Sequence, residues 1–318
     1  MNLLRPILIL AVIVGAIFVS TNYTEHHAGS NADPMDALYA HVVPAKLVFS
    51  DQGHGHGDQG TADHIDGHAV DDDHEHEAVG VFGLPESMAP TNLQVFQLAA
   101  ILLILIAFGG VGQHLRTGKG DKLTRILAGW VTYIRDEMVR PNMQRGDEQQ
   151  FLPYFLYLFF FIVFMNLMGL VPGGATATAS IFVTAALALT TLVAMLGCGM
   201  VSQGPIKFWT GLVPQVPAWL WPLMFVVEVF GLFIKPFALM IRLFANMTGG
   251  HLVVLSFMGL IFYFAGTDYS SIGWAVSPPA VALAVFIMII EGFVALLQAY
   301  IFTQLTIMFV GTAVHPEH

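Results

Sequence analysis

The sequence predicts an all-α fold: a polytopic membrane helix bundle with two long, tilted C-terminal helices and an amphipathic interfacial helix. Of the 318 residues, 56% are hydrophobic and only 11% are Asp, Glu, Lys or Arg, and the mean hydropathy is +0.69. A soluble domain carries about 25% charged residues. Several apolar tracts also exceed the roughly 20 residues that a helix needs to cross a bilayer. Together these observations indicate a membrane protein.

The composition excludes several function classes. Twelve basic against 22 acidic residues give a net charge of −10, with no basic stripe for nucleic acid. The single cysteine, Cys198, rules out a disulfide framework or a paired-cysteine site. The segment from Gly112 to Gly120 has the wrong spacing for a phosphate-binding loop and lacks its Ser or Thr. We therefore expect no ATP chemistry, cofactor or built metal site in this chain.

Residues 1–20 form a first unit, in which Arg5 precedes an apolar stretch from Ile7 to Val19. This length suits the core of a signal peptide, or a short anchor, better than a full membrane span. No clean small-residue cleavage site follows, so cleavage stays open. The basic start and acidic continuation predict that the next unit lies on the non-cytoplasmic side.

Residues 21–92 form an acidic, histidine-rich arm. Between Thr21 and Pro90, Lys46 is the only Lys or Arg against thirteen acidic residues. The Gly/His/Asp stretch from Asp51 to Glu77 lacks the apolar residues that would offset ordering entropy, which predicts a largely disordered arm. Its irregular histidine spacing, without HExxH, favours weak zinc or nickel binding of no functional consequence. A proton-collecting surface is a second interpretation.

Residues 93–318 form the membrane domain, whose first predicted span is Val95–Val111. The densest basic cluster follows at once and marks the cytoplasmic end, because positive charge is retained there. Leu123–Met138 mixes apolar and charged residues, which predicts an amphipathic helix in the cytoplasmic interface, ended by Pro141.

The remaining spans follow from apolar length. Phe151–Val171 and Ile181–Val201 predict a helical hairpin, and a loop broken by Gly and Pro is expected over Ser202–Pro217. The tracts Trp219–Ala265 and Ala280–Val314 are too long for a hydrocarbon layer of about 30 Å at 1.5 Å per residue. They must tilt, bend or lie partly in the interface.

Within the first long tract, Pro236 and Gly249-Gly250 are candidate bend points. The alternation of spans places the loop Gly266–Ser271 outside and the C-terminus in the cytoplasm.

Four charged residues lie inside these two tracts, where each costs about 2.5–3.5 kcal/mol at a helix centre. Such residues usually face a partner or an aqueous cavity. Their spacing predicts two polar stripes. The first tract carries Glu228, Lys235, Arg242 and Asn246 at intervals of seven, seven and four, with His251 further along. The second tract carries Glu291 and Gln298, seven positions apart.

Each residue also has a structural interpretation. Arg242 could pair with Glu291 or Glu228 to hold two helices together. Alternatively, because arginine cannot lose its proton, it could await a titratable carboxylate from another subunit.

Glu228 and Lys235 could simply reach the interface, and Asn246 and Gln298 could be ordinary interhelical hydrogen bonders. His251 and Glu291 are less ordinary, since one can pass a proton at physiological pH and the other can accept it.

At these residues the chain resembles subunit a of the rotary F-type ATP synthase. Arg242 opens an R-L-F-x-N-M motif within Lys235–His251, and Asn166–Gly173 is similar to the family's N-L-x-G-L-x-P-G turn. Glu291 with Leu297–Phe302 is similar to its last-helix motif. The resemblance extends from about Leu93 to Val314.

The resemblance implies a stator beside a rotating ring of c subunits, with b-type peripheral stalk and other synthase subunits as further partners. Arg242 would separate two aqueous half-channels and draw a proton from each arriving c-subunit carboxyl. The half-channel open to the outside would be lined by His251, Glu291, Asn246 and Gln298, and Glu228 would lie near the cytoplasmic exit with Lys235 close by. The setting would be lipid of a bacterial inner membrane, favoured by the signal-like start, or of a mitochondrial inner membrane.

Two features depart from the family. His251 and Glu291 are exchanged between helices relative to the best-known bacterial members, which keeps the same chemistry, and Ala238 stands where some members have a small hydroxyl residue. The His251/Glu291 pair favours protons over sodium.

Two rival hypotheses remain. A stand-alone secondary transporter would show paired inverted repeats, and no second copy of the Arg242 segment exists. An intramembrane metalloenzyme using the histidine-rich arm would need a fixed ligand set.

Deletion of Gln52–Glu77 should leave ATP-driven proton pumping intact, because this stretch lacks the apolar residues of a fold. Pumping by inverted membrane vesicles measures this. If the deletion prevented assembly of the complex, the arm would have to dock onto another part of it.

Overall fold

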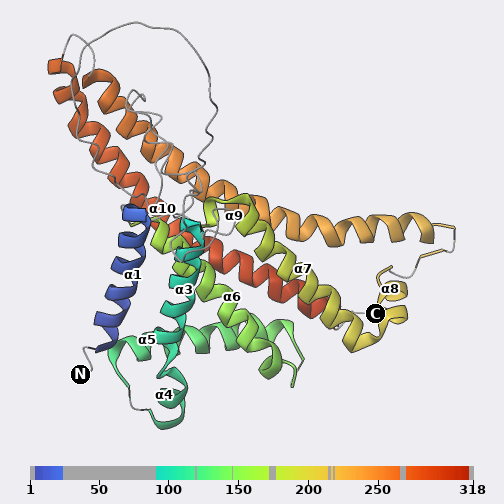
Figure 1. Cartoon of the computed structure of the whole chain (residues 1–318). Helices are drawn as coiled ribbons and strands as arrows, with labels where there is room; N and C mark the ends of the chain where they lie inside the picture. Colours follow the sequence, from blue (N-terminus) through green and yellow to red (C-terminus); the bar gives the residue numbers. More distant parts are fainter. Residues whose placement is uncertain are drawn as a thin grey trace, which may run out of the picture.

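The computed structural model describes residues 4–23, 91–118, 120–144, 146–171, 177–213, 216–217, 219–265 and 270–314. The elements in these ranges are helices, which confirms the predicted fold class (Figure 1). The α-helices are α1 (Leu4–Tyr23), α3 (Asn92–Phe108), α4 (Val111–Thr117), α5 (Lys122–Tyr133), α6 (Glu148–Gly169), α7 (Ile181–Gln203), α8 (Pro205–Gly211), α9 (Trp221–Ala265) and α10 (Ser270–Val314). The predictions for the arm fall almost wholly outside the described residues.

Four described helices, α6, α7, α9 and α10, are long and apolar enough to cross a membrane. The shorter apolar helices α1 and α3 lie side by side (Figure 1). α3 corresponds to the predicted first span, and α6 and α7 form the predicted hairpin. The chain is thus a multi-pass membrane protein.

The predicted amphipathic helix is α5, which runs along the lower edge of the bundle in Figure 1. It buries Thr124, Leu127, Ala128 and Val131 and exposes the opposite face. It continues as a π-helix, Ile134–Val139, and a 3-10 turn, Arg140–Asn142, that contains Pro141. The π-helix was not predicted, because the hydrophobic pattern does not distinguish a widened turn from an α-helical one.

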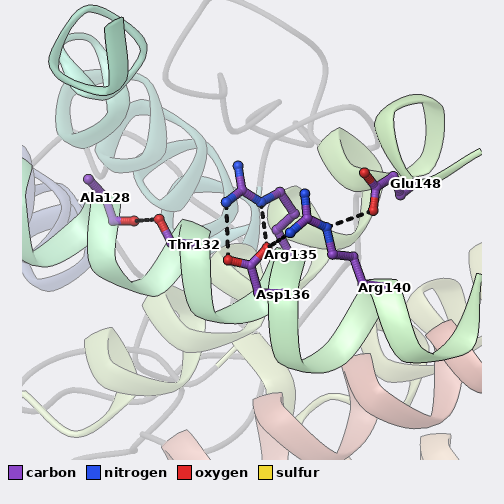
Figure 2. Close-up of polar contacts among 6 residues, drawn as sticks. All are labelled: Ala128, Thr132, Arg135, Asp136, Arg140 and Glu148. Atoms are coloured by element: carbon purple, nitrogen blue, oxygen red, sulfur yellow. Dashed lines mark hydrogen bonds and ion pairs between the residues drawn. The ribbon is translucent and has the colours of Figure 1, made fainter. Parts of the chain in front are cut away.

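An ion-pair network joins this segment to the start of α6 (Figure 2). Asp136 accepts hydrogen bonds from Arg135 Nε at 2.8 Å and Nη2 at 3.1 Å, and Arg140 Nη1 lies 2.7 Å from its Oδ1. Arg140 Nε in turn donates to Glu148 Oε2 at 3.0 Å. The hydrogen bonds from Arg135, with both guanidinium charges, hold the pKa of the Asp136 carboxyl below its usual value. The four charges satisfy one another where α6 enters the apolar layer.

The two over-long helices α9 and α10 form an antiparallel hairpin. α9 bends near the middle of its length, where its gold first part meets its orange second part in Figure 1. Pro236 lies inside α9 without ending it. The bend explains how 45 residues fit a layer that about 20 would cross.

Two boundary predictions were wrong. α10 begins at Ser270 rather than Ala280 and contains Pro278 and Pro279. Proline inside a helix removes a backbone donor and crowds the carbonyl four residues earlier, but in a membrane protein neighbouring helices and polar groups can satisfy that carbonyl, so the helix continues. The predicted loop over residues 202–217 contains the short helix α8, which starts with Pro205 at the first-turn position that proline favours.

The core lies where the C-terminal half of α10 packs against α6 on one side and α9 on the other. Phe155 and Ile162 of α6, Phe302 of α10 and Leu239 and Leu243 of α9 are all fully buried or nearly so. By contrast, the outer faces of α9 and α10 carry many exposed large apolar side chains. The described part of the chain leaves these faces uncovered.

Candidate functional site

The two polar stripes meet where α9 crosses α10. Asn246 Nδ2 donates a hydrogen bond to Gln298 Oε1 at 2.8 Å. Gln298 is only 2% exposed, and its Nε2 is buried without a hydrogen-bond partner. This hydrogen bond joins residues 52 positions apart and so holds α9 and α10 in register. The Gln298 Nε2 group remains available as a donor.

The second contact joins His251 and Glu291. His251 Nε2 lies 3.7 Å from Glu291 Oε1, which is longer than a hydrogen bond and fits an ion pair or a contact through one water. Glu291 is 5% exposed, and its Oε1 has no hydrogen-bond partner. The structure therefore brings together the two titratable groups that the sequence singled out.

Gly250 explains how the Glu291 carboxyl comes so close to α9. A Cβ added at Gly250 would lie 2.5 Å from Glu291 Cδ and Oε1. No side chain could occupy this space while the carboxyl stays in place. Gly250 was predicted as a candidate bend point, and its close approach to Glu291 is a contact that the sequence did not reveal. At the neighbouring Gly249 a Cβ would meet nothing within 4 Å.

Arg242 lies on the exposed side of α9, one helical turn before Asn246. Among the described residues it takes part in no hydrogen bond or ion pair. The contact of Glu291 is with His251, so the alternative of an Arg242–Glu291 pair within the chain has no counterpart here. Ile241 and Phe237, also exposed, give Arg242 apolar neighbours on α9. A permanent cation is thus presented on an apolar outer surface.

The structure does not bring Glu228 and Lys235 into this cluster. Glu228 is half-buried and Lys235 exposed. Lys235 Nζ lies 5.4 Å from the centroid of the Phe309 ring, a cation–π contact with the C-terminal part of α10. Both residues lie on the part of α9 that precedes Arg242.

A polar clamp that the sequence did not predict holds the crossing in place. Asn166 Nδ2 of α6 donates to the Ala295 carbonyl of α10 at 3.2 Å, and Thr178 Oγ1 donates to Asn166 Oδ1 at 2.7 Å. Asn166 and Thr178 are both 0% exposed. On α9, Thr248 Oγ1 donates to the Ala179 carbonyl at 3.4 Å.

The 3-10 turn Ala177–Ala179 thereby bonds to α6 and α9, and Asn166 bonds α6 to α10 one turn beyond Glu291. Asn166 was noted only as part of a family motif. The signal that could have revealed its role is an amide inside an otherwise apolar span, where side chains of this type usually bond to a neighbouring helix.

Fold and site together define a multi-pass membrane protein in which a titratable pair, His251 and the buried Glu291, joins α9 to α10, and in which Arg242 on α9 has no bonded partner among the described residues. Acidic and basic groups at such depth are costly and mark ion pathways. A family model, ATP synthase A chain, matches residues 94–311. The chain belongs to the ATP synthase A chain family, as the sequence motifs predicted.

Several bacterial proteins are similar to this chain over most of its length. ATP synthase subunit a of Chloroherpeton thalassium is 38% identical over 265 residues, covering 80% of this chain and 76% of the relative. ATP synthase subunit a 2 of Chlorobium luteolum is 34% identical over 330 aligned positions, covering 100% and 93%. ATP synthase subunit a of Anaeromyxobacter dehalogenans is 43% identical over 230 residues, covering 70% and 58%.

Replacement of Gly250 by alanine should slow ATP-driven proton pumping severalfold, because its methyl group must displace the Glu291 carboxyl from His251. Overpacking of this kind typically costs about 1–3 kcal/mol. The initial rate of dye quenching in inverted vesicles measures the effect, and Gly249→Ala is the matched control. Equal rates in the two variants would show that Gly250 does not set the position of Glu291.

Loss of the clamp should change how pumping depends on pH. Asn166→Leu and Thr178→Val each remove the hydrogen bond between these residues, and an unsatisfied buried group costs about 1–3 kcal/mol. We expect both variants to shift the pH of half-maximal pumping, because the α10 backbone beside Glu291 is no longer fixed. Thr178→Ser retains the hydroxyl and should restore the wild-type profile. A profile that stays unchanged in Asn166→Leu would limit the clamp to a purely structural role.

Proposed function

We propose that this chain is the proton-translocating stator subunit of a rotary F-type ATP synthase, and that it offers two aqueous half-channels, separated by Arg242, to a ring of c subunits. The observation that carries the proposal is the position of Arg242. It is exposed on α9, and no described residue bonds to it. Because arginine stays charged, a carboxylate on a neighbouring chain is the partner that would compensate it in a membrane.

The outer half-channel in this proposal follows the buried polar groups between α9 and α10. Glu291 Oε1 and Gln298 Nε2 are buried without partners. Buried polar atoms are normally satisfied, so water molecules are the groups that would pair with these two. Protons from outside would reach the His251/Glu291 pair, pass the Asn246–Gln298 bridge and arrive at a ring carboxylate close to Arg242.

Arg242 acts by electrostatics alone. As a protonated ring carboxyl approaches, the guanidinium favours its ionised form and the proton leaves. The same charge keeps a continuous water path from joining the two half-channels, because a proton passing the cation would be repelled. Rotation therefore becomes the route between them.

The cytoplasmic half-channel would use the part of α9 that precedes Arg242. Glu228 is its titratable group, half-buried, and Lys235 lies between Glu228 and Arg242 in the sequence. A proton released beside Arg242 would leave past these side chains.

The proposal assigns no covalent chemistry to this chain. ATP synthesis or hydrolysis belongs to other subunits of the complex, and the partners are the c-subunit ring and b-type peripheral stalk subunits. Protons rather than sodium suit the His251/Glu291 pair. The bacterial relatives support the plasma membrane of a bacterium as the location.

Substitution of Arg242 by alanine should abolish ATP-driven proton pumping while leaving assembly intact. Inverted vesicles from wild type and Arg242→Ala are compared at equal c-ring content with a pH-sensitive dye. Lys207→Ala is the control, since Lys207 is an exposed cation of α8, outside the α9–α10 crossing. Quenching in wild type and the control alone supports the proposal. Normal pumping by Arg242→Ala would make Arg242 a packing residue and bring the transporter hypothesis forward.

A further inference from the structure

An apolar pocket lies outside the proton-pathway residues, between α5, α6 and α10. Its volume is about 570 Å³, within the range of small-molecule sites. It is lined by Ile126, Gly129, Trp130, Tyr133, Phe159, Phe293, Leu296, Leu297 and Tyr300. Several of these side chains are strongly exposed, among them Phe293 at 68% and Ile126 at 61%. The pocket is therefore accessible from the surface of the chain.

One wall of the pocket is built of interlocked aromatic rings. Trp130 stacks on Phe159 with ring centroids 5.7 Å apart, and Tyr133 meets Trp130 edge-on at 5.9 Å. A hydrogen bond with Tyr300 raises the pKa of Tyr133 above its ordinary value. Tryptophan and tyrosine are the residues that favour the boundary between headgroups and acyl chains.

Two exposed cations lie on the same face of α5 as the pocket. Lys122 and Arg125 each precede a lining residue, Ile126 or Gly129, by four positions, so they share its side of the helix. Neither is joined by a hydrogen bond or ion pair to another described residue. Basic side chains beside an apolar pocket, on a helix predicted to lie in the cytoplasmic interface, match an anionic headgroup attached to an acyl chain.

We propose that this pocket holds an acyl chain of one anionic phospholipid, whose phosphate is bound by Lys122 and Arg125. The size of the pocket favours a chain over a protein helix. Its lining segments on α5 and α10 cover residues 126–133 and 293–300, about 12 Å of helix each. A transmembrane partner helix would need a groove of about 30 Å. The bound lipid would fill the gap that α5 and α10 leave.

Gly129 gives the means to close the pocket. It lines the pocket, and a Cβ added there would meet no heavy atom within 4 Å. Gly129→Phe would project a ring into the open space, whereas Gly129→Ala adds one methyl group and leaves most of the volume. Both replacements favour the helix over glycine.

The test uses the intact purified complex in detergent and phosphatidylglycerol with a photoreactive group on one acyl chain. Irradiation followed by peptide mapping should place the label within residues 126–133 and 293–300 of wild type and of Gly129→Ala, and Gly129→Phe should lose it. Complex yield and subunit content confirm that each variant assembles. This readout does not involve Arg242 or pumping, so its result is independent of the proposed function.

Headgroup recognition is tested by competition with unlabelled lipids. Phosphatidylglycerol should displace the label better than phosphatidylcholine, and Lys122→Gln and Arg125→Gln should each reduce this preference about fivefold. Arg116→Gln, which removes an exposed cation of α4, is the control and should leave it unchanged.

Three results would overturn the proposal: equal labelling of Gly129→Phe, equal competition by both lipids, or label found on a partner subunit instead. The last result would show that a protein helix covers the pocket.

Discussion

A guanidinium in a membrane cannot become neutral by losing its proton, and the rest of this structure is arranged around that permanent charge. Carboxylates and histidines can escape the cost of burial by becoming neutral, but arginine cannot. Arg242 is nevertheless exposed on an apolar face of α9 and is bonded to no described residue. Lipid alone would be a poor environment for it. The described part of the chain therefore supplies no counter-charge for Arg242. This is what we expect of a subunit whose partner supplies the opposite charge.

Close packing fixes the Glu291 carboxyl against α9 at His251. Glu291 is directed at His251, and the missing side chain of Gly250 allows the carboxyl to approach the α9 backbone. The clamp of Asn166 and Thr178 holds the α10 backbone one turn beyond Glu291. Because both clamp residues are fully buried, a rotation of α10 about its axis would break the hydrogen bond between Asn166 and Ala295 and leave a buried polar group without a partner. In the proposed function, these fixed positions would keep Arg242 available for the ring and Glu291 for the water path.

Much of the fold could be predicted from the sequence, since apolar length and charge position are strong signals in a membrane. The spans and the interfacial helix follow from them, whereas His251 and Glu291 were grouped by their proton chemistry and by the family resemblance. The failures have specific causes. The predicted tract began only at Ala280, just after Pro278 and Pro279, whereas α10 continues through both prolines to Ser270.

The helical period also placed Glu228 and Lys235 on one stripe with Arg242, but only tertiary packing decides which members of a stripe touch. The contacts of Asn166 with Ala295 and of Gly250 with Glu291 could not be predicted, because each joins positions more than 40 apart in the sequence.

The distribution of polar groups also limits which kind of partner can cover the outer face of α9. Its buried polar atoms lacking partners include Glu291 Oε1 and Gln298 Nε2, both on the inner face of α10, while its permanent cation lies on the outer face of α9. Water can form hydrogen bonds with Glu291 and Gln298. Around Arg242, however, water would have to leave when an apolar partner docks. A partner that covers the outer face must then bring its own negative charge to Arg242. Among apolar helices that could cover it, only one with a titratable carboxyl meets this requirement and can still leave after taking up a proton.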